Sequence, residues 1–576
     1  MTQPGSVAGP THRQILVVMS GLMLGMFLAA LDQTIVGTAI RTIADDLQGL
    51  SMQAWATTAY LITATISTPL YGKLSDIYGR KPWFTTAISV FVIGSLACTV
   101  VDSMAQLAAA RALQGLGAGG LMSLALTIIA DLVPPRQRPK YQGYFLAVFG
   151  TSSVLGPVIG GFFAGQDEIL GITGWRWVFL VNVPIGAAAL IVVAKVLNVP
   201  HSRRKHRIDY WGAAFLALSV VPLLLVAEQG RAWGWGSPVA IVCYVLGVVG
   251  LIAFLLVERR MGDEALIPLR LFGTSTFAMT IVAGAILGVG MFGGISMIPQ
   301  YLQIVRGYSP TDAGLMMLPM MLGIMTASIT SGRLTAKTGH YKLFPIIGTA
   351  LTVVALLLFW TVGVDTPIWQ PLVYMAVFGL GLGNCMQTLT VAAQNSVPFG
   401  DMGVATASVT FFRQLGGTLG VAVFLSLLFS TVADNIGRAF RSAAADPAFQ
   451  AALADPAVRA DPANAPVFDA LSTGGHGGVL DDSSFLLAVD PRLARPFQEG
   501  FTESIQLVFL VGAAVMALAF VVSLFIKEIP LRMHSPAQAA AMAAADEKPS
   551  EKHTEKPAEP RVEDARDEVR QRSQPG

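Results

Sequence analysis

The chain has 576 residues, of which 53% are hydrophobic and only 13% are charged, whereas a soluble domain carries about 25% charged residues. Its mean hydropathy of +0.60 excludes an ordinary soluble globular protein. The formal net charge of +2 shows no broad basic excess, which argues against a nucleic-acid partner. We therefore expect a multi-pass protein of the cell membrane, surrounded by the lipid bilayer.

Fourteen apolar segments are long enough to cross a bilayer, which takes about 20 residues of helix. They lie near residues 14-38, 53-74, 83-101, 104-130, 141-164, 176-197, 209-229, 236-257, 275-302, 311-333, 343-363, 368-392, 402-430 and 503-526. Lys and Arg cluster in the gaps after spans two, four, six, eight and ten, whereas the short gaps between them hold single arginines. The positive-inside rule makes the first set of gaps cytoplasmic. The sequence thus predicts an all-α protein with 14 transmembrane helices and both termini in the cytoplasm.

An internal repeat divides the chain into two similar halves. The segment "GKLSDIYGRK" at 72–81 follows span two, and "GRLTAKTGHYK" at 332–342 follows span ten. Two copies eight spans apart predict two six-helix halves with two additional helices between them, an arrangement typical of transporters. The predicted units are a cytoplasmic N-terminus at 1-13, an N-terminal six-helix bundle at 14-197, two additional helices with flanking loops at 198-274, a C-terminal six-helix bundle at 275-526, and a disordered cytoplasmic tail at 527-576.

A long external loop is predicted at about 432-501 within the C-terminal bundle. It carries three Ala-Asp-Pro triplets, at 445-447, 454-456 and 460-462. Asp is a good helix N-cap and Pro fits the first helical position, so we expect short surface helices. The loop is either a solvated connection without a specific function or a lid or docking surface for a periplasmic partner.

The predicted spans lack the residues that other chemistries need. All seven histidines lie in predicted loops or termini, and no carboxylate pair or Cys/His cluster occurs in a span, which argues against an enzyme. The three cysteines lie in apolar runs and favour neither a disulfide nor a metal site. "GLGAGG" at 115–120 fits a dinucleotide-binding pattern, but it follows no strand, and its small residues favour close helix packing instead. Without a phosphate-binding loop, we expect no cofactor and an ion gradient as the energy source.

Five motifs follow one another along the first half of the chain: "LDQTIVGTAI", "GKLSDIYGRK", "RALQGLGAGG", "GTSSVLGPVIGG" and "WRWVFLVNVPIG". In this order they resemble the motifs of the major facilitator superfamily, and within it the fourteen-spanner drug:proton antiporters. The similarity covers about residues 14 to 430 and the last span. It implies a secondary active exporter that moves amphiphilic drugs or other hydrophobic small molecules by alternating access in exchange for protons. An endogenous lipid or secondary metabolite is the alternative cargo, and a channel or a membrane enzyme is a remoter alternative.

The resemblance assigns roles to two of these motifs. The loop after span two matches a gating latch of the outward-facing state at Gly72, Asp76, Gly79, Arg80 and Lys81. The motif in span five matches the antiporter motif at Gly150, Gly156, Pro157, Gly160 and Gly161. Judged on the residues alone, Asp76 and Arg80 could equally form a solvated surface pair. The second loop copy has Ala336 in the place of Asp76, so a full latch is not expected there.

Asp32 is the only ionisable residue between Ile15 and Ile40, and a charge within a membrane span marks a functional site because its burial is costly. It lies about 12 Å from the outer end of span one, and Arg111 lies about 10 Å into span four. The resemblance makes these two helices neighbours, so we expect the pair to interact directly or through water. Asp32 either carries the coupling proton or fixes helix packing, and Arg111 either takes part in coupling or is a static counter-ion.

Six polar or aromatic residues of the spans are candidates for a pocket that binds an amphiphilic substrate. They are Gln33, Tyr60, Tyr301, Gln394, Phe412 and Arg413. Each is equally compatible with ordinary helix packing. Arg413 lies about 15 Å into span thirteen, where no acidic partner can be assigned to it. It binds either an anionic or carbonyl-bearing substrate or backbone carbonyl groups.

Overall fold

Long α-helices make up nearly all of the described residues in the computed structural model, which are 12–48, 52–134, 137–197, 209–308, 310–465, 467–468 and 489–532. The first part of the chain forms α1 (His12–Asp46), α2 (Gln53–Tyr78), α3 (Arg80–Cys98), α4 (Met104–Leu132), α5 (Arg138–Ala164), α6 (Trp177–Leu180) and α7 (Asn182–Val196). Strands β1 (Glu168–Ile169) and β2 (Ile172–Thr173) form a short antiparallel hairpin between α5 and α6. Two helices follow, α8 (Tyr210–Trp233) and α9 (Pro238–Met261).

The second part of the chain is equally helical. It forms α10 (Ser275–Gln300), a π-helical turn η5 (Tyr301–Val305), α11 (Pro310–Met316), α12 (Leu318–Thr338), α13 (Leu343–Trp360), α14 (Trp369–Asn395), α15 (Met402–Ala443), α16 (Pro447–Ala454), α17 (Pro456–Ala460) and α19 (Pro491–Leu524). Short 3-10 turns η2 (Gly174–Arg176), η3 (Gly262–Glu264), η4 (Leu269–Gly273), η6 (Phe399–Asp401) and η7 (Pro462–Asn464) connect these helices. We call the end of the bundle where α1 and α15 begin the inner end, and the opposite end the outer end.

Twelve helices or helix pairs in the described ranges are long and apolar enough to cross a membrane. Helices α2 and α5 coincide with two further predicted spans but are not among these twelve. Both helices are rich in Thr, Ser and Gly, which lowers their hydropathy relative to spans built from Leu, Val and Ile. The all-helical membrane architecture is thus confirmed, while the count of 14 spans and the cytoplasmic location of the termini stay predictions.

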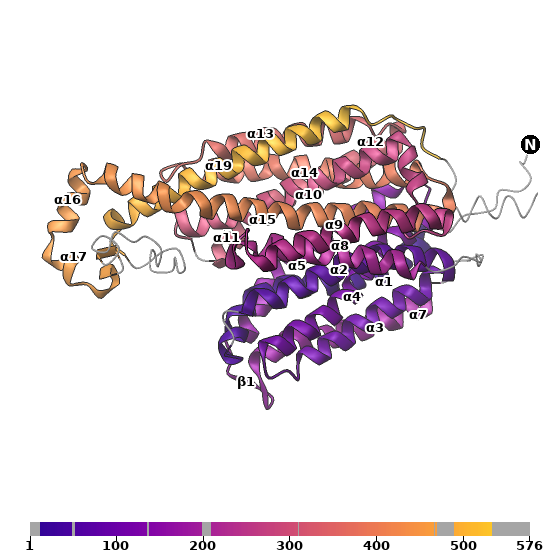
Figure 1. The fold of residues 1–576 in the computed structure, drawn as a ribbon, viewed down its shortest axis with the longest axis horizontal. Helices are drawn as coiled ribbons and strands as arrows, with labels where there is room; N and C mark the ends of the chain where they lie inside the picture. The colour runs from indigo at the N-terminus through magenta and orange to yellow at the C-terminus, as the bar shows by residue number, and fades with distance from the viewer. Residues whose placement is uncertain are drawn as a thin grey trace, which may run out of the picture.

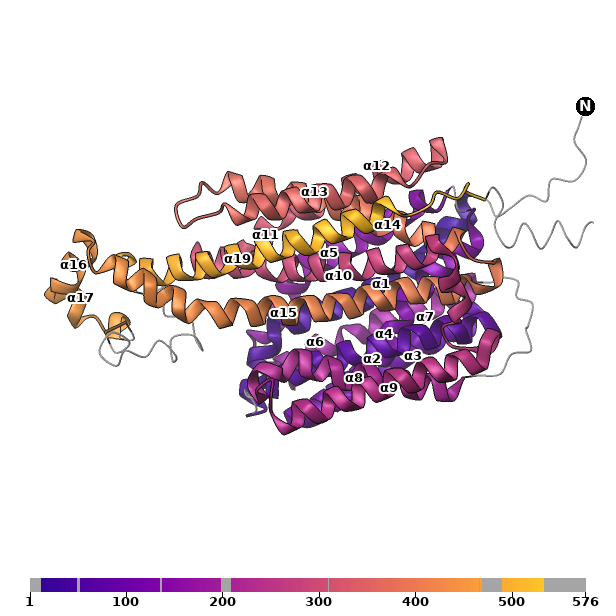
Figure 2. The same cartoon turned by 45° about the horizontal axis from the view of Figure 1, so that its top comes forward.

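The helices pack as two groups that lie side by side (Figure 1). In the first group α4 packs against α2 and α3, and α1 packs against α5 and α7. In the second group α14 packs against α12 and α13, while α15 packs against α10 and α19. The groups contact each other through α2 with α15 and α5 with α12. Helices α8 and α9 pack on each other along the side of the bundle, and α8 contacts both α2 and α15 (Figure 2).

Glycines allow several of these helices to approach each other closely. A methyl group on Gly115 of α4 would lie 2.3 Å from the Tyr60 carbonyl oxygen of α2, and one on Gly119 would lie 2.2 Å from the Ala64 carbonyl oxygen. Such distances are shorter than any van der Waals contact, so only glycine fits there. The prediction that "GLGAGG" serves helix packing is therefore confirmed.

The segment predicted as a loop at 432-501 is largely helical. Helix α15 has 42 residues, about 63 Å at 1.5 Å per residue, which is twice the thickness of the hydrocarbon core. The outer part of α15, together with α16, α17 and the start of α19, forms an outer lobe, seen at the opposite end of the molecule from the start of α15 (Figures 1 and 2). The Phe440 ring packs 4.8 Å from Phe497 and 5.9 Å from Phe449, measured between ring centroids. The described part of this segment is therefore a packed helical lobe and not a solvated loop, because its apolar side chains bury one another. A role as a lid or docking surface stays a prediction.

The three Ala-Asp-Pro triplets begin helical turns, as predicted. The Oδ1 atoms of Asp446, Asp455 and Asp461 accept hydrogen bonds of 2.9 to 3.0 Å from the backbone N–H two residues further on. A fourth Asp-Pro pair, which the sequence analysis overlooked, starts α19: Asp490 accepts from the Arg492 N–H at 2.9 Å. The hydrogen bond from the Arg492 side chain also holds the pKa of Asp490 below its ordinary value.

The predicted disordered tail at 527-576 begins later than expected. Residues 527–532 lie against the inner end of the second group. There Glu528 accepts a hydrogen bond of 2.9 Å from the Tyr341 N–H, and Asn395 donates to the carbonyl oxygens of Ile529 and Pro530 at 3.1 Å. The boundary at 527 is thus wrong because these residues satisfy backbone groups of the bundle. The rest of the predicted tail lies outside the described residues.

The caps predict a measurable effect on the outer lobe. Asp446→Ala removes the acceptor for the first turn of α16, which costs about 1 kcal/mol and should speed hydrogen exchange of the α16 amides about fivefold. Hydrogen–deuterium exchange with mass spectrometry of the purified protein measures this change. Asp434→Ala is the matched control, because Asp434 is an exposed acid on α15 that begins no helix. Equal exchange of α16 in both variants would show that the cap contributes nothing.

Candidate functional site

Asp32 lies at the centre of a fully buried polar cluster inside the first group of helices. Its side chain is 0% exposed, and that of Arg111 is 2% exposed. The Nη1 atom of Arg111 donates to Oδ2 of Asp32 at 2.5 Å. The other carboxylate oxygen accepts 2.8 Å hydrogen bonds from the side-chain amides of Gln114 and Asn182. The Asp32 carboxylate therefore has a charged partner and two neutral donors in place of water.

Arg111 is held from several sides. Its Nη1 atom also donates to Oε1 of Gln114 at 2.6 Å, and its Nε atom donates to the Ala56 carbonyl oxygen at 3.3 Å. The guanidinium carbon lies 4.2 Å from the centroid of the Tyr60 ring, a distance at which a cation is attracted to the aromatic face. Ser95 links the two amides by accepting from both Gln114 and Asn182, at 2.7 and 2.9 Å. The cluster thus joins α1, α2, α3, α4 and α7.

The sequence analysis named Asp32 and Arg111 but missed three members of this cluster. Gln114 lies one helical turn beyond Arg111, so both point the same way from α4. Ser95 and Asn182 come from α3 and α7, which are distant from Asp32 in the sequence. Gln114 and Asn182 stand in two of the quoted motifs, "RALQGLGAGG" and "WRWVFLVNVPIG". The presence of a polar residue in an otherwise apolar motif could have indicated that Gln114 and Asn182 belong to a buried polar cluster.

A second charged cluster lies at the inner end, where α2 meets α3. Gly79 has a φ of 99° and lets the chain turn between the two helices. Nη1 of Arg80 then contacts Oδ1 of Asp76 at 2.5 Å, and its Nε donates to Asp131 of α4 at 2.7 Å. Asp131 was not foreseen, although it ends span four. Since both acids are mostly buried and paired, the solvated-pair interpretation of Asp76 and Arg80 is wrong.

This inner cluster also contacts the second group of helices. Oδ2 of Asp76 accepts a hydrogen bond of 3.0 Å from the Val404 N–H, at the start of α15. A methyl group on Gly72 would lie 2.5 Å from the Ala407 side chain, so the glycine allows α2 to rest on α15. Lys81, in contrast, points into its own group and donates to the Ala194 carbonyl oxygen at 2.7 Å.

Arg138 of α5 makes a further contact between the groups. Its Nη1 donates to Oε1 of Gln394 on α14 at 2.9 Å, while Nε and Nη2 donate to the carbonyl oxygens of Val133 and Ala130. Gln394 in turn donates to Thr406 of α15 at 2.9 Å. The inner end is therefore held together by hydrogen bonds from both α2 and α5.

Two glycines of the predicted antiporter motif bring α5 against α1. A methyl group on Gly156 would lie 2.0 Å from Oγ1 of Thr34, and one on Gly160 would lie 2.3 Å from Oγ1 of Thr38. The other described glycines of the motif differ: Gly150 is 3.8 Å from Met325 by the same measure, and Gly161 has nothing within 4 Å. Pro157 lies on the α5 backbone between them. The motif thus positions the helix that carries Asp32.

The six candidate substrate residues do not form one pocket. Gln33 is exposed on α1, next to Asp32, and Tyr60 belongs to the Arg111 cluster. Tyr301 is buried near the outer end, where its hydroxyl donates to the Gly363 carbonyl oxygen at 3.0 Å. Phe412 is half-buried against Phe411 and Phe272.

Of the remaining two candidates, Gln394 is tied to Arg138 and Thr406 as described above. Arg413 is half-buried in α15. Within the described ranges it makes no hydrogen bond or ion pair.

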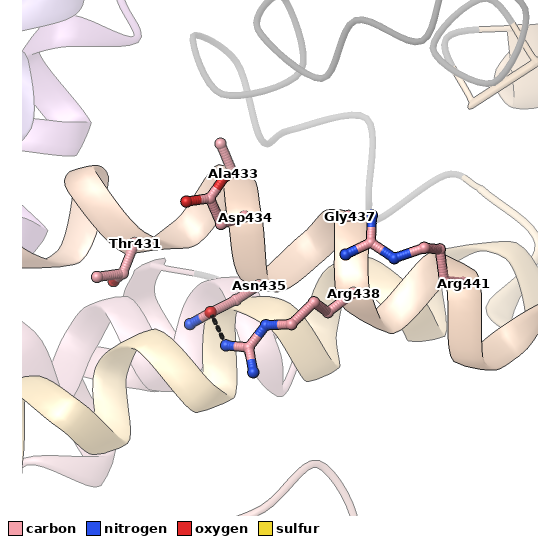
Figure 3. Close-up of a pocket in the computed structure, with 7 residues that line it drawn as sticks. All are labelled: Thr431, Ala433, Asp434, Asn435, Gly437, Arg438 and Arg441. Atoms are coloured by element: carbon pink, nitrogen blue, oxygen red, sulfur yellow. Dashed lines mark hydrogen bonds between the residues drawn. The ribbon is translucent and has the colours of Figure 1, made fainter.

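A polar cavity of about 690 Å³ lies in the outer part of α15 (Figure 3). It is lined by Thr431, Ala433, Asp434, Asn435, Gly437, Arg438 and Arg441. Its first lining residue is 18 positions beyond Arg413, about 27 Å along the helix. This cavity therefore belongs to the outer lobe and not to the region of Asp32 or Arg413.

Two groups of membrane-spanning helices, with a buried ion pair in one group and polar contacts between the groups at one end, are characteristic of membrane transporters. The sequence profile of the Major Facilitator Superfamily matches residues 22–421 of the chain. Because this match covers more than half of the sequence, the chain belongs to the Major Facilitator Superfamily. It is thus a multi-pass membrane protein of a transporter family.

Several known proteins are similar to the chain. An uncharacterized MFS-type transporter of Mycobacterium tuberculosis (strain H37Rv) is 35% identical over 92% of this chain and 71% of its own length. The multidrug transporter protein MdtP of Bacillus subtilis (strain 168) is 37% identical over 73% of this chain and 76% of its own. A tetracycline resistance determinant of Streptomyces rimosus is 39% identical over 56% of this chain and 92% of its own.

The fold also resembles a solved transporter structure. The proton:xylose symporter XylE, solved with 6-bromo-6-deoxy-D-glucose, aligns with a TM-score of 0.56 over 92% of this chain and 99% of its own, at 17% identity. At this identity the likeness concerns the fold alone.

Asp131 is expected to stabilise the closed inner end. Asp131→Asn leaves Arg80 without its α4 carboxylate, so Asp76 is held less firmly against α15. With Ala407→Cys as a reporter in a background without the three native cysteines, N-ethylmaleimide should label at least about tenfold faster, which corresponds to a loss of 1.4 kcal/mol. Asp102→Asn, at an exposed site near the outer end, should leave labelling unchanged. Unchanged labelling in Asp131→Asn would mean that the cluster does not control this end.

Proposed function

We propose that the protein exports amphiphilic drugs or related hydrophobic small molecules in exchange for protons, with Asp32 as the proton carrier. The observation that carries this proposal is the buried Asp32–Arg111 pair with its amide donors. An ionisable pair inside a membrane is costly to keep unless it has a function. Asp32 is also the only acid in the membrane part of α1.

The cluster offers a route by which the carboxylate could gain and lose a proton. When Asp32 is protonated, the Arg111 guanidinium keeps Oε1 of Gln114, the Ala56 carbonyl oxygen and the Tyr60 ring as partners. The ion pair can therefore separate without leaving the arginine unsatisfied. A carboxyl whose contact with a cation differs between two conformations has two proton affinities, which is what coupling to a gradient needs.

The contacts between the two groups support alternating access. Polar bonds and close packing hold the groups together at the inner end, while Gln33 on the outer half of α1 is exposed and Gly37 has open space around it. If the inner end is cytoplasmic, as the positive-inside rule predicts, this arrangement corresponds to an outward-facing state. Proton uptake from outside would then precede the change to an inward-facing state.

The relatives support drugs as the cargo. Two of them are named as a multidrug transporter and a tetracycline resistance determinant, and they share 37% and 39% identity with the chain. Sequence similarity at this level supports a shared class of substrate, and an endogenous lipid or secondary metabolite is the alternative cargo. Transport assays with purified protein therefore need arms for tetracycline, an amphiphilic cation and a fluorescent lipid.

The proton role of Asp32 has a direct test in proteoliposomes under an imposed pH gradient. Asp32→Asn keeps the shape and hydrogen-bonding capacity of the side chain but cannot exchange a proton. We expect pH-driven tetracycline transport to fall to the level of protein-free liposomes, while exchange of tetracycline across the membrane without a gradient persists. Measurement of both fluxes separates loss of coupling from loss of folding.

Asp45→Asn is the matched control, since Asp45 is an exposed acid near the outer end of the same helix. It should transport like the unmodified protein. Full proton-driven transport by Asp32→Asn would rule out Asp32 as the carrier. Absence of any driven transport by the unmodified protein, with all three cargo arms, would rule out the exporter proposal.

A further inference from the structure

The second group contains an arginine that differs from the other buried arginines. Arg413 lies about 16 Å beyond the start of α15, near the middle of the membrane part. Within the part of the chain that the structure describes, it has neither an ion pair nor a hydrogen bond. Arg111 and Arg80, in contrast, are paired with carboxylates, and Arg138 donates hydrogen bonds to Gln394 and to backbone carbonyl oxygens. Since a cation in a low-dielectric interior needs a partner, Arg413 retains its capacity to bind an acidic group.

A second polar side chain with an unpaired atom lies at the same depth. Gln387 of α14 is 5% exposed, and its Oε1 atom accepts no hydrogen bond. Gln394 and Thr406 form a hydrogen bond between α14 and α15 near the inner end. Helices α14 and α15 run in opposite directions. Gln387 lies seven residues, or two turns, outward from Gln394, and Arg413 lies the same distance outward from Thr406. Two turns return a side chain to nearly the same face, so Gln387 and Arg413 occupy facing sides of α14 and α15.

This side of α14 and α15 is turned toward the other group of helices. Gln394, on the same face of α14 as Gln387, accepts a hydrogen bond from Arg138 of α5. Helix α15 contacts α2 and α4 of the first group. Arg413 and Gln387 therefore lie near the interface between the two groups, where a transported molecule has to pass. They do not hydrogen bond to each other, so each keeps its capacity to bind a third group.

We propose that Arg413 and Gln387 bind the acidic group of the cargo, a carboxylate or an ionised enol carried by an otherwise apolar molecule. This inference rests on the proposed export function and specifies its substrate class. A guanidinium donates two parallel hydrogen bonds to a carboxylate. The side-chain amide N–H of Gln387 donates a further one, and its Oε1 accepts from a hydroxyl or N–H group where the cargo carries one. An amphiphilic cation is repelled by Arg413 and meets no acid there, so the site disfavours it.

Two dyes that differ in one group test the proposal. Rhodamine B has a free carboxylate, whereas rhodamine B ethyl ester has the same ring system with that carboxylate esterified. Fluorescence anisotropy with the purified, detergent-solubilised protein measures the binding of each dye without the need for transport. We expect rhodamine B to bind at least about tenfold more tightly than the ester, as for a charge-assisted hydrogen bond. Equal binding of the two dyes, or binding of neither, would overturn the proposal.

Variants then assign the preference to named side chains. Arg413→Gln should remove the preference for the carboxylate, Arg413→Lys should keep part of it, and Gln387→Leu should reduce it. Arg438→Gln, at an exposed arginine in the outer part of the same helix, should change nothing. Elution volume and melting temperature of each variant confirm its folding. An unchanged preference in folded Arg413→Gln would place the acidic group elsewhere.

Transport of the same dyes separates this inference from the proposed function. In proteoliposomes with a pH gradient, the unmodified protein should export rhodamine B faster than the ester, and Arg413→Gln should export both at similar rates. If the carboxylate preference is present in binding but no variant or condition gives driven transport, the exporter proposal fails while the binding site stands. If both dyes are exported at equal rates by the unmodified protein, the substrate class is wrong and export stands.

Discussion

The cost of placing charge in a membrane interior governs the first group of helices. Asp32 and Arg111 neutralise each other at 2.5 Å, but an ion pair that has lost its water also needs hydrogen bonds for its remaining atoms. Gln114 and Asn182 supply these donors, and Ser95 holds both amides in place. Because the five side chains come from four helices and the Tyr60 ring covers Arg111 from a fifth, satisfying one carboxylate fixes how α1, α2, α3, α4 and α7 pack. The glycines of α4 and α5 are needed for the same reason: without them the helices could not approach closely enough for these bonds to form.

The inner end follows a different electrostatic arrangement. The charge of Arg80 is neutralised within the first group, where the guanidinium pairs with Asp76 and Asp131. Hydrogen bonds that cross between the groups run from the Val404 N–H to Asp76, and from Arg138 to Gln394 and to the Met402 sulfur. Separation of the groups would therefore break a few bonds worth about 1 kcal/mol each, while Arg80 keeps its carboxylates and Arg138 keeps the carbonyl oxygens of Val133 and Ala130. A low energetic cost of breaking these bonds is what an end that both closes and opens requires.

Three features could be predicted from the sequence because each depends on a local pattern about one helix long. These are the membrane architecture, the similar depth of Asp32 and Arg111 in the membrane, and the helix starts at Asp446, Asp455 and Asp461. Gln114, Asn182 and Asp131 were missed because their importance arises only when distant helices meet, and a single Gln or Asn in an apolar segment has many ordinary explanations. The packing of the outer lobe was missed for a related reason. Its apolar residues are spread over α15, α16 and α19, and only their convergence shows a core. Of the six candidate substrate residues, Arg413 alone combines partial exposure with an unsatisfied charge.

The two halves of the bundle thus differ in their ionised groups, since Asp32 and Arg111 of the first half are paired and, within the described residues, Arg413 of the second is not. This difference affects the energetics of the proposed export. In the first half the charge is internally balanced and, under the proposed function, changes by one proton. In the second half, Arg413 is a positive charge that a cargo could balance. Exchange of one proton inward for a singly charged cation outward moves no net charge, so only the pH gradient would drive it. Exchange of one proton inward for an anion outward moves two charges, each worth about 2.3 kcal/mol per 100 mV of membrane potential. An inside-negative membrane would then expel an acidic cargo more strongly than a basic one, and an arginine at mid-membrane depth in the second half is the residue that such a cargo needs in order to leave water.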